Sequence, residues 1–201
     1  MRRIATLLTA LAIAAIAHNA VAQEAPPVSP PTTVDPAKGL PEWEKIYAVF
    51  SHPRCASCHV EDDHPRWSGE HYGGTRFHAF NVQRGEDGSG FGNAGLRCTT
   101  CHFDSNSNVL HGPPGAPNWH LAPVEMAWWE KSSAEVCAQI KDPARNGDRT
   151  LEEVADHIRD DKLVAWGWAP GPGREPAPGS AEETFQALQN WAASGSPCPS
   201  N

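Results

Sequence analysis

Tyrosine, methionine and long apolar stretches are all scarce in this 201-residue chain. Tyr and Met occur twice each, whereas Pro and Gly number 19 and 17, and the hydrophobic fraction is 39%. Abundant Pro and Gly interrupt regular structure, so the composition predicts a loop-rich, mostly helical fold built around something other than a large apolar core. The length allows one domain, or two very small ones. Beyond residue 22 no stretch is apolar enough to cross a bilayer.

Basic residues are also in deficit. The chain has 16 Lys and Arg against 24 Asp and Glu, which gives a formal net charge of −8. An acidic chain is unsuited to nucleic acid or to an anionic membrane surface. It is compatible with a partner protein that presents a complementary positive patch.

The N-terminus has the three parts of a secretory signal peptide. Arg2 and Arg3 precede an apolar run over residues 4–17, and Ala20-Val21-Ala22 forms a small-x-small cleavage site. Cleavage after residue 22 leaves 14 Lys and Arg against 24 Asp and Glu, a net charge of −10. The sequence therefore predicts a signal peptide over residues 1–22 and an exported, periplasmic protein. The alternative is an uncleaved N-terminal anchor.

Two short stretches share one pattern, C-x-x-C-H: Cys55-Ala56-Ser57-Cys58-His59 and Cys98-Thr99-Thr100-Cys101-His102. This is the attachment pattern of a c-type haem. Two thiols at this spacing can form thioether bonds to both vinyl groups of one porphyrin, and the next residue places an imidazole nitrogen on the iron. The sequence thus predicts two haem c groups. They would be attached through Cys55, Cys58, Cys98 and Cys101, with His59 and His102 as proximal ligands.

Zinc is the alternative for four cysteines in two C-x-x-C pairs. Each pair is followed by His, and the segment between Cys58 and Cys98 is longer than in a zinc ribbon. Free thiol clusters also oxidise in an exported protein. These three features favour haem.

The sixth iron ligand separates an electron carrier from an enzyme, because a strong-field His or Met fills the iron whereas an open position admits a substrate. Met126 is the one Met that remains after signal cleavage, so at most one haem can have His/Met ligation. We favour His78, flanked by Phe77 and Phe80, as one distal ligand, and His120 or Met126 for the second haem. Met126 could equally be a packed core residue. The weaker candidates are His52, His64, His71, His111 and His157, the last interpreted as a surface histidine.

The fold class expected is mainly α and loop-rich, with cytochrome c-like helices packed around two covalent haems. Residues 23–41 are expected to form a Pro-rich disordered linker, and residues 42–201 the dihaem domain. Pro41 is expected to open a helix, and residues 60–95 to form a long loop. Capping patterns predict three later helices, at Ser132-x-x-Glu135, Thr150-x-x-Glu153 and Ser180-x-x-Glu183.

Two further cysteines, Cys137 and Cys198, lie outside the motifs. An even remainder in an oxidising compartment predicts one disulfide that ties the C-terminal tail to the helix after Ser132. Two buried free thiols are the alternative.

Several segments of the chain, over roughly residues 40–199, resemble a group of small exported proteins labelled as an isoquinoline 1-oxidoreductase subunit. The segments are Leu96-Arg97-Cys98-Thr99-Thr100-Cys101-His102, Trp119-His120-Leu121-Ala122-Pro123, Ile140-Lys141-Asp142-Pro143-Ala144-Arg145-Asn146-Gly147, Trp166-Gly167-Trp168 and Gly173-Arg174-Glu175-Pro176. The resemblance implies a dihaem c-type cytochrome that transfers electrons beside a molybdenum hydroxylase.

The function expected is a periplasmic electron carrier between a dehydrogenase and the respiratory chain. It rests on two haem motifs, many potential sixth ligands and no recognisable nucleophile–base constellation. One alternative is a dihaem enzyme, a peroxidase or small-substrate oxidase, with one open haem site. A haem-based sensor is a third possibility, which would require a partner domain elsewhere.

Overall fold

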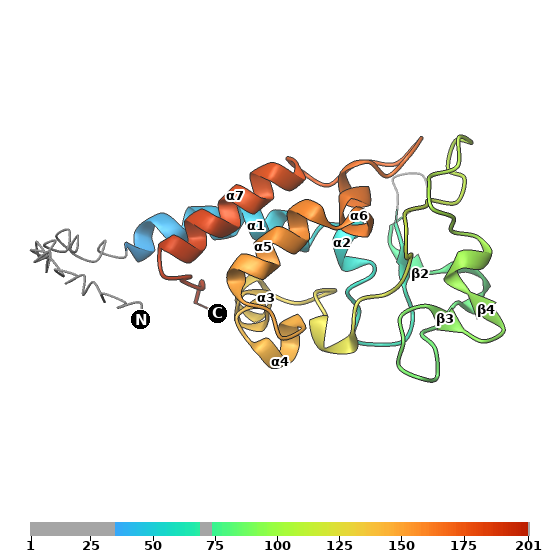
Figure 1. Ribbon diagram of the computed structural model, residues 1–201, viewed down its shortest axis with the longest axis horizontal. Coiled ribbons are helices and arrows are strands. Elements are labelled where there is room, and N and C mark those ends of the chain that lie inside the picture. The colour runs from blue at the N-terminus through green and yellow to red at the C-terminus, as the bar shows by residue number, and fades with distance from the viewer. Residues whose placement is uncertain (1–34, 69–73, 201) are drawn as a thin grey trace, which may run out of the picture. The chain divides into compact units, whose positions relative to one another are not determined.

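The computed structural model describes residues 35–68 and 74–200. The predicted signal peptide and residues 23–34 of the predicted linker lie outside this range. The helices are α1 (Pro36–Phe50), α2 (Pro53–Ala56), α3 (Ser133–Ile140), α4 (Pro143–Asn146), α5 (Leu151–Asp160), α6 (Lys162–Ala165) and α7 (Ala181–Ala193). The expected mainly α, loop-rich class is confirmed (Figure 1). None of the helices in the described part is long and apolar enough to cross a membrane.

The first helix starts earlier than predicted. Asp35 is its N-cap, with a side-chain oxygen that accepts a hydrogen bond from the Ala37 N–H, and Pro36 occupies the first helical position. Pro41 therefore lies inside α1 and does not open it. Residues 36–41 are therefore helical, and the predicted linker extends too far in the C-terminal direction. The helix start was missed because the Asp35–Pro36 signal lies within a Pro-rich stretch.

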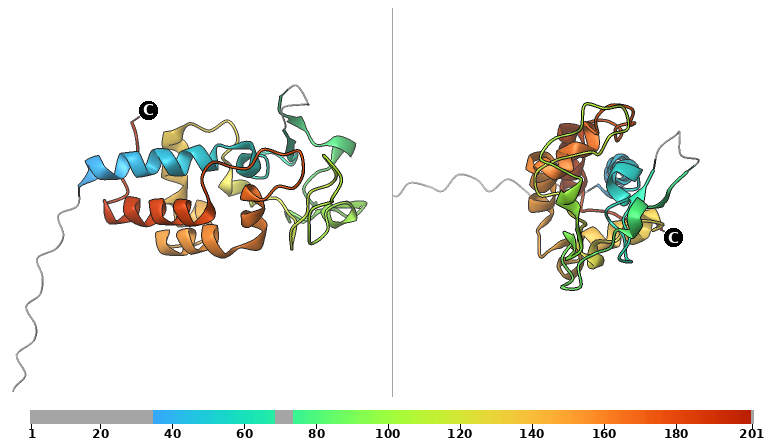
Figure 2. Two further views of the ribbon diagram at one scale, coloured as in Figure 1. Left: turned by 90° about the horizontal axis from the view of Figure 1, so that it is seen from above. Right: turned by 90° about the vertical axis from the view of Figure 1, so that its right-hand side faces the viewer.

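The apolar core is formed where α1, α5 and α7 lie side by side, with α3 against α1 (Figures 1 and 2). The indole rings of Trp43 on α1 and Trp191 on α7 lie 5.1 Å apart, centre to centre. Most of the residues whose spacing predicts an inward face are buried: Trp43, Ile46, Phe50, Val136, Cys137, Ile140, Val154, Ile158, Phe185, Leu188 and Trp191. Tyr47 and Leu151, predicted to face inward with them, are half-buried and pack against this core. The helical periodicity of the sequence therefore identified this core correctly.

The three predicted helix starts are confirmed. Ser132 and Thr150 each form a full capping box, in which the side chain accepts the N–H of the glutamate three residues on and that glutamate accepts the N–H of the cap. Ser180 accepts the N–H of Glu183 and caps α7 in the same position. These caps fix where α3, α5 and α7 begin.

The predicted loop over residues 60–95 contains regular structure that periodicity does not reveal. Strand β1 (Arg66–Trp67) pairs antiparallel with β2 (Arg76–Phe77), and β3 (Gly92–Asn93) pairs with β4 (Leu96–Arg97). Each strand has only two residues, too few for an alternating pattern. The β3–β4 turn leads directly into the second C-x-x-C-H motif.

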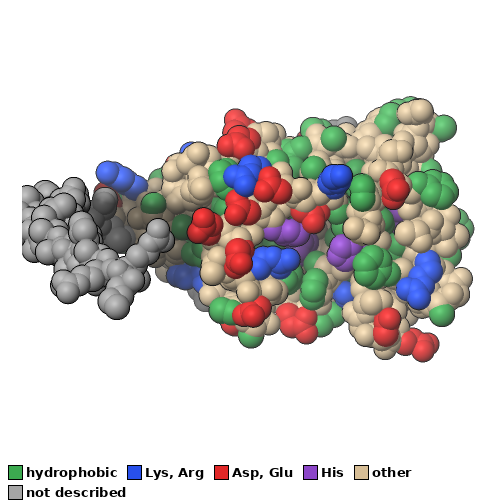
Figure 3. Space-filling model, viewed as in Figure 1, with side chains coloured by type: hydrophobic (Ala, Val, Ile, Leu, Met, Phe, Trp, Pro, Cys, Tyr) green, Lys and Arg blue, Asp and Glu red, His purple; other side chains and the backbone are tan. Residues whose placement is uncertain are grey.

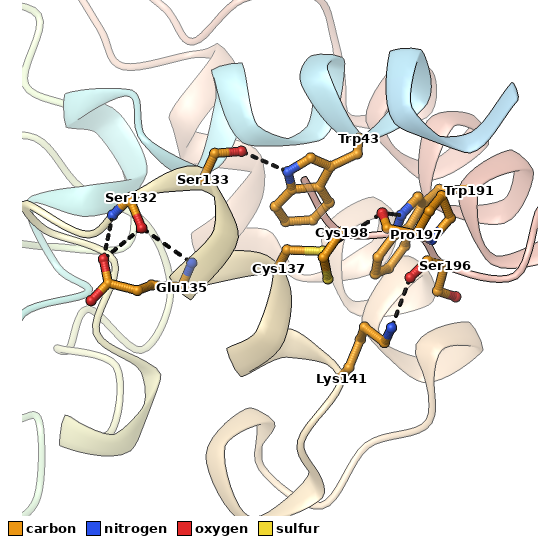
Figure 4. The surroundings of a disulfide bond; sticks show 10 residues. All are labelled: Trp43, Ser132, Ser133, Glu135, Cys137, Lys141, Trp191, Ser196, Pro197 and Cys198. Carbon is orange, nitrogen blue, oxygen red and sulfur yellow. Dashed lines mark hydrogen bonds between the residues drawn. A yellow bond between two sulfur atoms is a disulfide. The ribbon is translucent and has the colours of Figure 1, made fainter. Parts of the chain in front are cut away.

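The predicted disulfide is present and joins Cys137 on α3 to Cys198, 61 residues further along the chain. Figure 4 shows the tail held by two more contacts beside it. The indole N–H of Trp191 donates to the Pro197 carbonyl, and the Lys141 ammonium donates to the Ser196 carbonyl, each at 2.8 Å. The C-terminal tail is thus fixed to both α3 and α7.

Replacing both cysteines (C137A/C198A) is expected to lower the free energy of unfolding by about 4 kcal/mol. The disulfide closes a loop with a sequence separation of 61 residues, and the entropy that it removes from the unfolded chain grows with loop length. Urea unfolding followed by circular dichroism measures the change. A midpoint equal to that of the wild-type protein would contradict it.

Candidate functional site

The first C-x-x-C-H motif begins in the short helix α2. His52 caps this helix through Nδ1, which accepts the Arg54 N–H at 3.2 Å, and Pro53 takes the first helical position. The turn then closes as the N–H groups of Cys58 and His59 both donate to the Cys55 carbonyl, at 3.1 and 3.3 Å. This brings the two thiols and the imidazole of the motif to one side of the helix end, where all three line a single cavity.

The imidazole of His59 is held on several sides by one segment. Its Nδ1 lies 2.8 Å from the Met126 carbonyl oxygen, and its ring stacks on the Trp128 indole with centres 3.4 Å apart. The backbone N–H groups of Trp128 and Trp129 donate to the His59 carbonyl at 2.8 and 2.9 Å. Because Nδ1 donates to a carbonyl, Nε2 is the nitrogen free to bind a metal.

The Trp128 indole is itself fixed by the helical core. It stacks on Phe50 of α1 with centres 4.2 Å apart, and its Nε1–H donates to the Gln139 side-chain oxygen on α3 at 2.5 Å. The Gln139 amide nitrogen donates to the Arg145 carbonyl. The orientation of His59 is therefore determined by residues of α1 and α3.

The second motif repeats the arrangement of the first with different neighbours. Cys98 opens a 3-10 turn after β4, and the N–H groups of Cys101 and His102 donate to the Cys98 carbonyl at 3.2 and 3.0 Å. His102 Nδ1 lies 2.8 Å from the Pro114 carbonyl oxygen, and its ring stacks on the Trp119 indole with centres 4.5 Å apart. Nε2 is again the nitrogen that is free to act as a ligand.

Each motif lines a cavity. The first cavity, about 450 Å³, is bordered by Cys55, Cys58 and His59. The second cavity, about 260 Å³, is bordered by Cys98, Cys101 and His102. Five residues line both cavities and therefore form the wall between them: Arg54, Cys58, Trp119, His120 and Trp166.

The distal candidates are divided between the two cavities. His78 lies edge-on to His102 in the second cavity, with ring centres 5.8 Å apart. Met126 lines the first cavity, and His120 lines both. His78 is thus paired with the second motif and Met126 with the first.

The remaining histidines have varied positions. His52 caps α2, and the His64 ring lies edge-on to Phe77 with centres 5.2 Å apart. His111 lines the second cavity. His71 lies outside the described residues.

Burial keeps the imidazoles of both motifs and the thiols of the first motif uncharged. Withdrawal from water lowers the pKa of His59 and of His102 to about 4, against opposition from the carbonyls bound to Nδ1. Burial raises the pKa of the Cys55 thiol to about 12 and that of Cys58 to about 11. At pH 7 the imidazoles are neutral, which is the form that binds metals, and these thiols are protonated.

The position of one cavity residue was only partly foreseen from the sequence. His157 was interpreted as a surface histidine because of its charged neighbours; its side chain is 39% exposed, but it also lines the first cavity. It stands on α5 next to Ile158 and one turn after Val154, both buried. Its position beside the apolar stripe of α5 was the signal that could have placed it inward.

No protein-family model, no curated protein and no solved structure matches this chain. Across residues 35–68 and 74–200, no three or more His, Cys, Asp or Glu side chains are grouped to hold a metal ion. The chemistry of the two cavities is inferred from the residues that line them.

Proposed function

We propose that the chain is an exported electron-transfer protein with two haem c groups, one in each cavity. The observation that carries the proposal is the shared geometry of the two C-x-x-C-H motifs. Each brings two thiols and one imidazole to the wall of a cavity, and each imidazole has Nδ1 on a carbonyl and Nε2 free. A bound haem would supply an iron that cycles between the ferric and ferrous states.

The residues of the cavities suit a haem. Cys55 and Cys58 would hold the first haem and Cys98 and Cys101 the second, through thioether bonds. Aromatic and aliphatic side chains around them offer apolar contact to a flat macrocycle. Arg54 lines both cavities and Arg174 the second, so cationic groups stand where the carboxylates of a haem could be bound.

The second cavity favours electron transfer over catalysis. An iron between two imidazoles holds their ring centres roughly 6 Å apart, because each bond to a ring nitrogen is about 2 Å long. The 5.8 Å between His78 and His102 matches that span. A haem filled on both sides exchanges electrons without binding a substrate.

The first cavity is the larger of the two, at about 450 Å³ against about 260 Å³, so it is the one with room for a substrate of a haem enzyme. A peroxidase or small-substrate oxidase would need an open iron position there. The identity of the ligand opposite His59 decides between the two functions.

The proposed partners are a dehydrogenase or a molybdenum hydroxylase as electron donor, and an acceptor of the respiratory chain. The net charge of −10 after signal cleavage, from 14 Lys and Arg against 24 Asp and Glu, suits partners with a positive docking patch. The proposed site of action is the periplasm, which the signal-peptide pattern at residues 1–22 supports.

Expression with a c-type haem attachment apparatus tests the proposal. We expect the mass of the mature chain to increase by two haems, and electron paramagnetic resonance to show two low-spin ferric signals. Reduction and reoxidation should be reversible, without peroxide turnover. A chain without covalent haem would refute the proposal, and a dominant high-spin signal with rapid peroxide reduction would establish the enzyme instead.

A further inference from the structure

Three side chains of the first cavity could bind an iron on the side opposite His59. They are Met126, His120 and His157, and all three line this cavity. The structure distinguishes between them by the length of the side chain, by the secondary structure that holds the residue, and by the place of the residue in the cavity.

Met126 is excluded because its side chain is too short to bring the sulfur to the side of the iron opposite His59. Its carbonyl oxygen lies 2.8 Å from His59 Nδ1, on the side of the imidazole turned away from a metal at Nε2. A sulfur on the far side of that metal would lie roughly 9 Å from this oxygen, since the hydrogen bond, the ring and two metal–ligand bonds intervene. A fully extended Met side chain brings its sulfur only about 6–7 Å from its own carbonyl oxygen.

His120 belongs to the wall between the cavities. Its Nδ1 contacts the Asn118 carbonyl two residues before it, and its ring packs on Phe91 with centres 4.8 Å apart. It stands in an irregular segment, where no helix or strand fixes its direction. It is therefore the weaker of the two histidines.

His157 has the support that a metal ligand needs. It stands on α5, which begins at the Thr150 capping box and packs against α7. Its Nδ1 lies 3.7 Å from Asp161 Oδ2, which is an ion-pair distance beyond hydrogen-bond range, so the carboxylate stands on the Nδ1 side of the ring and Nε2 is the nitrogen available to a metal. Asp161 is fixed in turn, because its Oδ1 accepts the N–H groups of Leu163 and Val164 at 2.8 and 3.1 Å.

The position of His157 agrees with this role. His157 and His59 line the same cavity, together with Ile158 of α5 and Phe50 of α1. Figure 3 shows histidine side chains reaching the surface in the middle of the face it presents.

We propose that His157 is the sixth ligand of the first iron, opposite His59, with Asp161 as the residue that positions it. The inference rests on the proposed function. Both irons then have two histidine ligands, His59 with His157 and His102 with His78. Neither haem has an open position for peroxide or oxygen.

The test is the haem-loaded H157A variant. We expect its mass to show two covalent haems still, while one of the two low-spin signals is replaced by a high-spin signal. That haem should bind carbon monoxide, and added imidazole should restore the low-spin signal. H157M should instead produce the long-wavelength absorption band of a sulfur-ligated ferric haem at one haem only.

Two control variants make the result specific. H120A should keep both low-spin signals. D161N keeps the cap of α6, because Asn caps as well as Asp, and should change the reduction potential of one haem without changing its spin state. If H157A keeps two low-spin haems, or H120A yields the high-spin signal, the inference is wrong. A wild-type chain without covalent haem would overturn the proposed function itself, and the mass measurement distinguishes the two failures.

Discussion

Replacing Cys98 and Cys101 with alanine is expected to remove one haem and leave the other in place. The reason is that each cysteine pair stands beside its own histidine, which binds a carbonyl of a different segment, Met126 for His59 and Pro114 for His102. The C98A/C101A variant should therefore carry one haem by mass and half of the wild-type absorbance per chain. The remaining low-spin signal should be that of the first haem.

The reciprocal variant, C55A/C58A, should lose the other haem and keep the complementary signal, so that the two spectra sum to that of the wild-type protein. This variant is informative because Cys58 also lines the second cavity. C58A/C98A is the matched control, since it removes one thiol from each motif and should keep two haems, each with a single thioether bond. Loss of both haems from either pair variant would show that the cavities do not load independently.

Local signals in the sequence were sufficient for the three capped helices α3, α5 and α7, whereas the short helices α2, α4 and α6 were not predicted. Ser132, Thr150 and Ser180 each combine a capping residue with a glutamate three positions later, and the apolar stripes that follow are buried as expected. The start of α1 was missed because Asp35 and Pro36 stand in a Pro-rich stretch. The strands β1 to β4 were missed because two residues cannot display a period.

In the candidate site, too, the features set by local sequence could be predicted and those set by contacts between distant segments could not. The spacing within each C-x-x-C-H motif is local, so sequence alone predicts Cys55, Cys58, His59 and their counterparts as site residues. The partner of each histidine depends on how distant segments meet. His78, which follows β2, lies with its ring centre 5.8 Å from that of His102, and His157 lines the first cavity from α5, which packs against α7. No periodicity or composition encodes the contact of His78, whereas the apolar stripe of α5 places His157 beside buried residues.

The last expected result concerns pH, and it distinguishes the loaded protein from the unloaded chain. In the unloaded chain the folded-state pKa of His59 and of His102 is about 4, below the ordinary value of 6.5. Above pH 6.5 neither state of the chain protonates these rings, so their contribution to stability is fully present. As the pH falls from 6.5 to 4, the two imidazoles become protonated in the unfolded chain but stay neutral in the folded chain. Their contribution to the free energy of unfolding is lost over this range.

The size of this loss of stability follows from the lowering of the two histidine pKa values from 6.5 to about 4. It is roughly 3 kcal/mol for each histidine and about 6 kcal/mol for both. Such a loss is comparable to the whole stability of an ordinary domain, about 5–15 kcal/mol. The unloaded C55A/C58A/C98A/C101A variant should therefore lose most of its resistance to urea between pH 7 and pH 4.

In the loaded protein each of the two imidazoles would have an iron at its Nε2, so neither would take up a proton in this range. The loss of stability between pH 6.5 and pH 4 should then be largely absent. The carboxylates whose pKa is lowered by hydrogen bonds, such as Asp62 beside Arg66, destabilise both forms equally at acidic pH. The difference between the two urea-midpoint curves therefore isolates the histidines that bind iron, among which His59 and His102 have their pKa lowered to about 4. Parallel curves would mean that His59 and His102 are not the residues that the haems occupy.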